Sequence, residues 1–176
     1  DILNQTLPLP MSAEQREFVK SHLSVLADKW LFSRKIYPND PLCASYKVQP
    51  GDLLSKIGDK FNVPHQILMQ INHIPSPRSL QAGQTIKVVK GPFHARVFKS
   101  TFSLDIYLQN TYVRSFPVGL AREQYDTPTG LWLVERNNKL IRPTWTDPDT
   151  GKTYLAEDPN YPLGARWVGL EGLKGA

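Results

Sequence analysis

Apolar positions recur every three or four residues between residues 12 and 31, which is the spacing of one face of an α-helix. Ser12 stands three residues before Gln15, a spacing that is typical of a capping box at the start of a helix. The recurring positions are Phe18, Val19, His22, Leu23, Val25, Leu26, Trp30 and Leu31. The pattern predicts an amphipathic helix whose apolar stripe rests on another element.

A strand-helix-helix-strand order is predicted for residues 46–90. Tyr46 and Val48 alternate as in a short strand, and Asp52 follows a Pro-Gly turn where its side chain can cap a helix. Pro64 suits the first turn of a second helix, and a final alternating stretch predicts the closing strand. The apolar positions on one face of each helix are Leu53, Leu54, Ile57 and Phe61, then Ile67, Leu68 and Ile71.

Strands and turns replace helices after residue 91. The stretch SLDIYLQ alternates apolar and polar positions, and TYVRSFPVGL follows it after a turn at Asn110, so a hairpin is predicted. Pro117 places its strand at an edge or beside a bulge, because proline cannot donate a ladder hydrogen bond. Residues 126–136 predict a turn that leads into another strand.

Residues 142–164 are dense in turn residues and long enough to form a functional loop or lid. Within them, the DPDTG stretch at residues 147–151 has the alternate carboxylates of a calcium loop. It lacks the downstream ligands of such a loop and the glutamate at its twelfth position. We therefore expect DPDTG to be a hairpin turn.

The stretch YPNDPLCAS at residues 37–45 is rich in proline and predicts a linker. Cys43 lies in this stretch, and we expect it to be a small linker residue. Because it is the single cysteine, no disulfide can form within the chain.

Composition indicates a globular chain of two small domains. It has 176 residues, of which 40% are apolar, and no apolar run approaches the length of a membrane span. The net charge is +5, and residues 46–90 carry six basic and two acidic side chains. This excess of basic side chains favours binding of an acidic polymer, but basic side chains that only face water give the same pattern. There is no basic stripe interleaved with aromatic residues, and the four histidines show no metal-ligand spacing, so we expect neither nucleic-acid binding nor a metal or other cofactor.

The segment from Tyr46 to Val89 resembles a LysM module at many positions at once. The matching motifs are Tyr-x-Val from Tyr46, Pro-Gly-Asp from Pro50, Phe-x-Val from Phe61, Asn-x-Ile from Asn72 and Ala-Gly-Gln from Ala82. Leu53 departs from the family, which usually carries Thr after Gly-Asp.

This resemblance implies that two loops face a chain of N-acetylglucosamine. Such an uncharged glycan offers amides and hydroxyls for backbone hydrogen bonds, and acetyl methyls for small apolar contacts. The implied ligand-facing residues are Gly51, Asp52, Leu53 and Leu54, then Asn72, His73, Ile74 and Pro75. The alternative is that these loops only close the fold.

The segment after residue 90 resembles the N-terminal part of an L,D-transpeptidase (YkuD-like) catalytic domain. The resemblance rests on FHARVF with the hairpin after it, on FPVGLAREQYDTPTGLWLV and on YPLGARWVGLEG. It implies a mainly β, sandwich-like domain. The chain is then α+β, with a helical lead segment and linker at 1–45, a LysM module at 46–90 and an incomplete transpeptidase-like domain at 91–176.

That family performs acyl transfer with a cysteine thiolate, a histidine that activates it and donors for the oxyanion. It supplies them from a His-Gly-Thr stretch and a later Ser-x-Gly-Cys-x-Arg stretch, and neither occurs in this sequence. Cys43 precedes the LysM segment and has neither motif around it, so no catalytic residue is assigned. We expect the chain as given to be inactive, with the nucleophile beyond Ala176.

Arg166 and Trp167 have two interpretations. Guanidinium and aromatic groups suit a substrate cleft for peptide and sugar, whereas a tryptophan in a strand is more often part of the core. In the family that this segment resembles, Trp167 to Gly172 leads toward the strands that carry the histidine and the cysteine. If those partner strands lie beyond residue 176, this segment is left as an unpaired edge in the chain as given.

Together the resemblances imply an L,D-transpeptidase of the bacterial cell envelope, periplasmic or exported, that binds peptidoglycan glycan and stem peptides and forms crosslinks. The alternative is a peptidoglycan-binding protein with a catalytically inactive transpeptidase scaffold.

Overall fold

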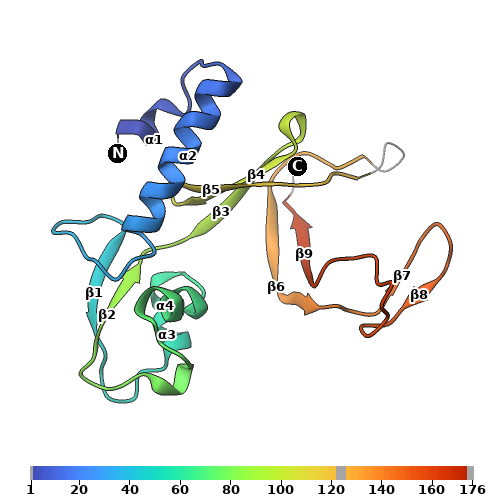
Figure 1. The fold of residues 1–176 in the computed structure, drawn as a ribbon. Coiled ribbons are helices and arrows are strands. Elements are labelled where there is room, and N and C mark those ends of the chain that lie inside the picture. The colour runs from blue at the N-terminus through green and yellow to red at the C-terminus, as the bar shows by residue number, and fades with distance from the viewer. Residues whose placement is uncertain (1, 122–125, 174–176) are drawn as a thin grey trace. The chain divides into compact units, whose positions relative to one another are not determined.

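The chain forms two compact units, residues 1–120 and residues 121–176, in a computed structural model that describes residues 2–121 and 126–173 (Figure 1). The elements of the first unit are α1 (Ile2–Thr6), α2 (Ala13–Trp30), β1 (Cys43–Lys47), α3 (Leu54–Phe61), α4 (His65–Asn72), the short 3-10 helix η1 (Pro77–Ser79), β2 (Thr85–Val89), β3 (Phe93–Phe98), the 3-10 helix η2 (Lys99–Thr101), β4 (Ser103–Leu108) and β5 (Thr111–Pro117). Those of the second unit are β6 (Trp132–Ile141), β7 (Trp145–Thr146), β8 (Thr153–Tyr154) and β9 (Arg166–Gly172). Helices combined with antiparallel sheets confirm the predicted α+β class.

The predicted capping box begins α2. The Ser12 hydroxyl accepts a hydrogen bond from the Gln15 backbone N–H at 3.2 Å, and the Gln15 side-chain oxygen accepts one from the Ser12 N–H at 2.9 Å. Glu14 in the first turn and Lys29 in the last turn complement the helix dipole. The sequence therefore specifies where this helix begins.

The prediction of a single inward apolar stripe on α2 is wrong for part of the stripe. Leu23 and Ala27 are buried, but Phe18, Val25 and Leu26 are 64%, 52% and 49% exposed. The reason is that the spacing of three to four residues admits positions on two different faces. The helix carries one apolar face toward the sheet and a second apolar face toward solvent.

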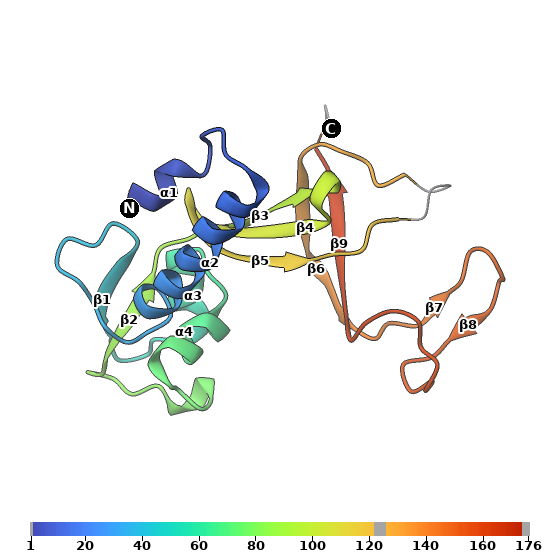
Figure 2. The same cartoon turned by 45° about the horizontal axis from the view of Figure 1, so that its top comes forward.

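The segment from β1 to β2 has the predicted strand-helix-helix-strand order. β1 and β2 pair antiparallel, with Cys43 opposite Val89 and Lys47 opposite Thr85. Figures 1 and 2 show α3 and α4 beside this strand pair. Gly58 permits the close turn between the helices, because a Cβ there would lie 2.7 Å from the Val63 carbonyl oxygen.

One hydrophobic core joins these elements to the end of α2 and to the next sheet. Its fully or almost fully buried members include Leu31, Cys43, Val48, Leu54, Ile57, Leu68, Ile71, Ile86, Val88, Val89 and Leu108. The predicted linker at residues 37–45 is wrong at its end, because β1 begins at Cys43. Cys43 is only 3% exposed and belongs to this core.

A three-stranded antiparallel sheet with the order β3-β4-β5 completes the first unit. The hairpin of β4 and β5 confirms the predicted turn, and Pro117 ends an edge strand, as expected. α2 packs on this sheet, where Leu7 and Leu23 form a small second core with Tyr107 and Tyr112.

Asp105 of β4 is a buried carboxylate beneath α2. Its side chain is 1% exposed, its two oxygens accept hydrogen bonds from the Lys20 ammonium at 2.9 and 2.7 Å, and the Ser115 hydroxyl donates at 2.7 Å. A buried ion pair is tolerated only when its hydrogen bonds are satisfied in this way. The pair fixes α2 to the sheet.

The second unit contains two small antiparallel sheets, β6 with β9 and β7 with β8. Trp132 lies opposite Gly172 and Ile141 opposite Arg166, so β9 pairs with β6 along one side. The expectation of an unpaired edge concerns the other side of β9, where this two-stranded sheet has no further strand among the described residues. The DPDTG stretch is the predicted hairpin turn, in which the Gly151 N–H donates to the Asp147 carbonyl at 2.8 Å.

Candidate functional site

The loop between β1 and α3 presents an exposed apolar side chain next to a glycine in a left-handed conformation. Gly51 has φ of 85°, a conformation that other residues rarely adopt. Leu53 follows at the start of α3 and is 61% exposed, whereas Leu54 is buried beneath it. Of the predicted loop residues, Gly51 and Leu53 are open to a ligand and Leu54 supports them.

Asp52 closes this loop and does not cap α3, which corrects the sequence-based interpretation. Its Oδ2 accepts hydrogen bonds from the Gln49 backbone N–H and the Tyr46 hydroxyl, both at 2.8 Å, and α3 has no side-chain cap. The bond from the Gln49 N–H, followed by that from Tyr46, lowers the pKa of Asp52. The bond to Asp52 raises the pKa of Tyr46. Asp52 thus holds the shape of the loop as an ionised acceptor.

The loop after α4 has one buried and two exposed members. His73 takes a left-handed conformation with φ of 54° and ends the helix, and both it and Pro75 are exposed. Ile74 is 6% exposed and its N–H donates to the Met69 carbonyl at 2.9 Å. The side chain of Ile74 anchors the loop between the two exposed residues.

Asn72 holds this loop to β2. Its amide donates to the Leu68 and Lys87 carbonyls at 2.9 and 2.8 Å and accepts from the Lys87 backbone N–H at 2.8 Å. The side chain is 5% exposed, so every polar atom it has is used inside the fold. Asn72 positions its neighbours and is not open to a ligand.

Both loops join helices to the same end of the β1–β2 pair, where Lys47 faces Thr85. The pairing continues into the connections, because the Val48 N–H donates to the Gln84 carbonyl at 2.9 Å and the Gly83 N–H to the Val48 carbonyl at 2.8 Å. The exposed positions of the two loops are Gly51, Leu53, His73 and Pro75, with Asp52 half-buried among them. An apolar leucine and proline beside backbone amides and one imidazole suit an uncharged ligand with polar and methyl groups.

Lys87 is a polar core residue that the sequence analysis missed. Its ammonium donates to the Trp30, Ser33 and Lys35 carbonyls, at 2.9 Å for Ser33 and 2.7 Å for Lys35. Burial lowers its pKa. The signal that could have found it is a lysine within the otherwise apolar stretch IKVV.

Cys43 does not have the environment of a nucleophile. Burial is the largest cause and raises the pKa of its thiol to about 12. The Lys87 ammonium opposes this rise, and the nearby Asp40 carboxylate adds to it. A thiol must be ionised to attack, and reactive cysteines have depressed pKa values. Cys43 is therefore a protonated core thiol at neutral pH.

Arg166 and Trp167 lie on β9 in the second unit, whereas the loops just described belong to the first unit. Trp167 is 39% exposed and lies opposite Leu140, so the prediction that it is a core residue is wrong. The Arg166 side chain is also exposed and makes one long hydrogen bond, 3.4 Å, to the Ala165 carbonyl. Their role in a substrate cleft stays a prediction.

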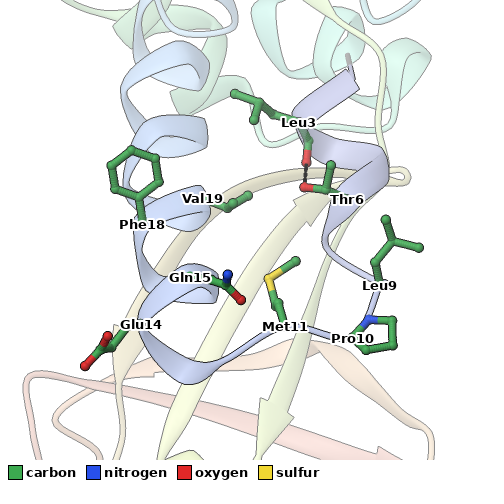
Figure 3. Close-up of a pocket in the computed structure, with 9 residues that line it drawn as sticks. All are labelled: Leu3, Thr6, Leu9, Pro10, Met11, Glu14, Gln15, Phe18 and Val19. Carbon is green, nitrogen blue, oxygen red and sulfur yellow. Dashed lines mark hydrogen bonds between the residues drawn. The ribbon is translucent and has the colours of Figure 1, made fainter.

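An apolar hollow of about 610 Å³ lies between α1 and α2. Figure 3 shows Val19 and Met11 turned toward α1, while Phe18, which also lines the hollow and is 64% exposed, lies at the side of α2. Glu14 is its one charged lining residue, so the hollow offers no pair of groups for acid-base chemistry.

Residues 2–121 and 126–173 contain no helix that is long and apolar enough to cross a membrane. Within the same residues, no group of three or more His, Cys, Asp or Glu side chains is placed to hold a metal ion.

Comparison with known proteins finds one matching domain family and two similar curated relatives. Residues 46–89 match the LysM domain family. Over 134 residues, the chain is 27% identical to "Putative L,D-transpeptidase YkuD" of Bacillus subtilis strain 168, an alignment that covers 72% of this chain and 69% of the relative. The protein of the same name from Bacillus licheniformis is 24% identical over 132 residues, covering 71% of this chain and 68% of that one.

A solved structure, a MoCVNH3 variant in complex with (N-GlcNAc)4, is 21% identical with a TM-score of 0.28, and the match covers 43% of this chain and 54% of that one. A TM-score this low does not indicate a shared overall fold. The chain therefore contains a LysM domain and is similar to L,D-transpeptidases over about 70% of its length.

Proposed function

We propose that this protein binds the glycan of peptidoglycan through the two loops of its LysM domain and works in the bacterial cell envelope. The observation that carries the proposal is the pair of loops at one end of the β1–β2 sheet, with Leu53, His73 and Pro75 exposed on a scaffold fixed by Asn72. The LysM match covers both loops.

The chemistry of the loops fits N-acetylglucosamine units. An acetyl methyl group finds an apolar partner in Leu53 or Pro75, and sugar hydroxyls and amides find backbone groups around Gly51 and His73. No charged side chain is required for such a ligand, which agrees with the neutral character of the exposed positions. Leu53 replaces the usual threonine, so contacts at that point are apolar.

Retention on insoluble peptidoglycan tests this proposal. We expect Leu53→Glu to lose most retention, because the introduced carboxylate is unpaired against an uncharged sugar. Gln66→Glu, on the exposed surface of α4, changes the charge by the same amount and should leave retention unchanged. Equal retention of both variants would refute glycan binding by these loops.

We further propose that this protein, like the L,D-transpeptidases that it is similar to, works as an acyl-transfer enzyme that crosslinks stem peptides, and that residues 1–176 alone do not perform this transfer. The buried, protonated thiol of Cys43 supports the second statement. A second reading, a glycan-binding protein with an inactive transpeptidase scaffold, rests on the same observation.

Exchange of a D-amino acid onto a tetrapeptide stem measures this activity. The 176-residue chain and its Cys43→Ala variant should both show no exchange above buffer. Exchange by the chain that is lost in Cys43→Ala would overturn the assignment of Cys43 as a core residue.

A further inference from the structure

We propose that the outer face of α2 is a self-association surface, on which two copies of this chain pair their α2 helices in antiparallel orientation. This face was expected to pack within the fold, and the structure leaves it exposed. The inference does not depend on glycan binding.

The outer face is a narrow line of five residues, Glu14, Phe18, His22, Val25 and Lys29, which are all exposed. At about 100° per residue, these positions fall within about 40° on either side of Phe18, and Ala27 lies on the opposite side of the helix. The line is spaced by four, four, three and four residues, as in the seam of helices that pack side by side. We name it the α2 seam.

The apolar part of the α2 seam is too exposed for a face that meets only water. Phe18 is 64% exposed and stacks on His22 with ring centroids 4.2 Å apart, and Val25 is 52% exposed. Leu26, beside the seam, is 49% exposed and widens the apolar area. Apolar side chains that gather on one face of a helix, rather than being scattered singly, indicate an interaction site.

The charges at the two ends of the α2 seam select a second copy in antiparallel orientation. When two copies cross beside His22, Glu14 of each faces Lys29 of the other, and Phe18 of each faces Val25 of the other. A parallel pair would place Glu14 against Glu14 and Lys29 against Lys29, which is repulsive. The surface is therefore complementary to itself, as a two-fold interface requires.

The association should be weak. The seam spans 16 residues, about 24 Å of helix, and a single helix from each copy buries less than the roughly 1,200–2,000 Å² of a standard interface. We expect a dissociation constant on the order of 10 to 100 µM.

Sedimentation equilibrium of the full chain, over about 5 to 500 µM, tests the proposal. The expected result is a reversible monomer-dimer equilibrium whose dissociation constant rises about thirtyfold in Phe18→Glu, the loss typical of a central contact. Glu14→Lys and Lys29→Glu should each weaken the dimer, and the double variant should restore it. Circular dichroism of each variant is the control for helix content, which should match that of the wild type.

Val97→Glu is the matched control, because Val97 on β3 is 50% exposed and lies outside the α2 seam. It should leave the equilibrium unchanged. A chain that is monomeric throughout, a dimer that Phe18→Glu does not weaken, or an equal effect of Val97→Glu would overturn the proposal. Failure of the double charge reversal to restore association would overturn the antiparallel arrangement.

Discussion

The two compact units of this chain bury their apolar residues to very different extents. Both described hydrophobic cores lie in the first unit. The second unit exposes large apolar side chains on or directly beside its main strand pair, namely Leu131, Trp132, Leu133, Val134, Leu140, Ile141, Trp167, Val168, Leu170 and Leu173.

The first unit can therefore hold a binding loop in place through its own buried core. The second unit buries fewer apolar side chains and supports a loop less firmly. An isolated two-stranded sheet is marginally stable in water, because it has no second layer to cover it. The LysM loops are joined instead to a closed core through Leu54, Asn72 and Ile74. We therefore assign ligand binding to these loops first and keep Arg166 and Trp167 as the second candidate.

The largest effect should come from the core of the first unit. Leu68→Ala removes a side chain that is 0% exposed and should lower the free energy of unfolding by about 4 kcal/mol, within the range for buried leucines. Leu133→Ala is the matched change in the second unit, where the side chain is 53% exposed, and should cost less than about 0.5 kcal/mol. Urea unfolding measures both. Comparable losses would mean that the second unit is covered in solution.

Breaking the buried ion pair of Lys20 and Asp105 should cause the second-largest loss in the free energy of unfolding. Lys20→Met leaves Asp105 buried without its cation and should cost about 3 kcal/mol. Arg114→Gln removes the partner of Asp28 from a pair whose side chains are 45% and 52% exposed, and should cost less than about 1 kcal/mol. The same unfolding experiment compares them, and equal costs would show that Asp105 is hydrated.

Ionisation of the Cys43 thiol should change the free energy of unfolding least of all near neutral pH, and clearly only at alkaline pH. Burial raises the pKa of its thiol from 9.0 to about 12. Above pH 9 the unfolded chain therefore loses a proton that the folded chain keeps. Its contribution is fully present below pH 9 and falls between pH 9 and 12 by up to about 1.4 kcal/mol per pH unit.

The difference between the wild type and Cys43→Ala isolates this contribution in unfolding measured from pH 8 to pH 11. The wild type should lose stability more steeply above pH 9. Parallel curves would show that the thiol is not buried in the folded protein.

Local signals in the sequence predicted much of the fold. The capping box of Ser12 and Gln15, the turn at Asn110 and the hairpin turn at DPDTG depend on neighbouring residues, and each was located correctly. The LysM segment combined such signals in a fixed order, so its strand-helix-helix-strand path was also predicted.

Errors arose where distant segments decide the environment. Cys43 was taken as a linker residue because its partner Val89 is far away in sequence. The burial of Lys87 was not predicted, because the carbonyls that bind its ammonium come from residues 30–35, far away in sequence. Asp52 has the position of a cap but bonds backward to Gln49 and Tyr46.

The sequence predicted which residues belong to the two loops of the candidate site. It did not predict which of these residues are exposed and which support the loops. A resemblance gives which residues belong to a loop, whereas burial decides which of them a ligand can reach. Leu54, Asn72 and Ile74 proved to be supports, and Gly51, Leu53, His73 and Pro75 are the exposed members. This distinction needs the packing of β2 against α4.

Hydrogen exchange of the full chain, with and without a tetramer of N-acetylglucosamine, shows directly whether the two LysM loops bind the glycan. We expect slower exchange in the peptides that cover residues 51–54 and 73–75, and no change in the peptide that covers Arg166 and Trp167. Unchanged exchange in both loops at saturating tetramer, or protection confined to β9, would mean that these loops do not bind it.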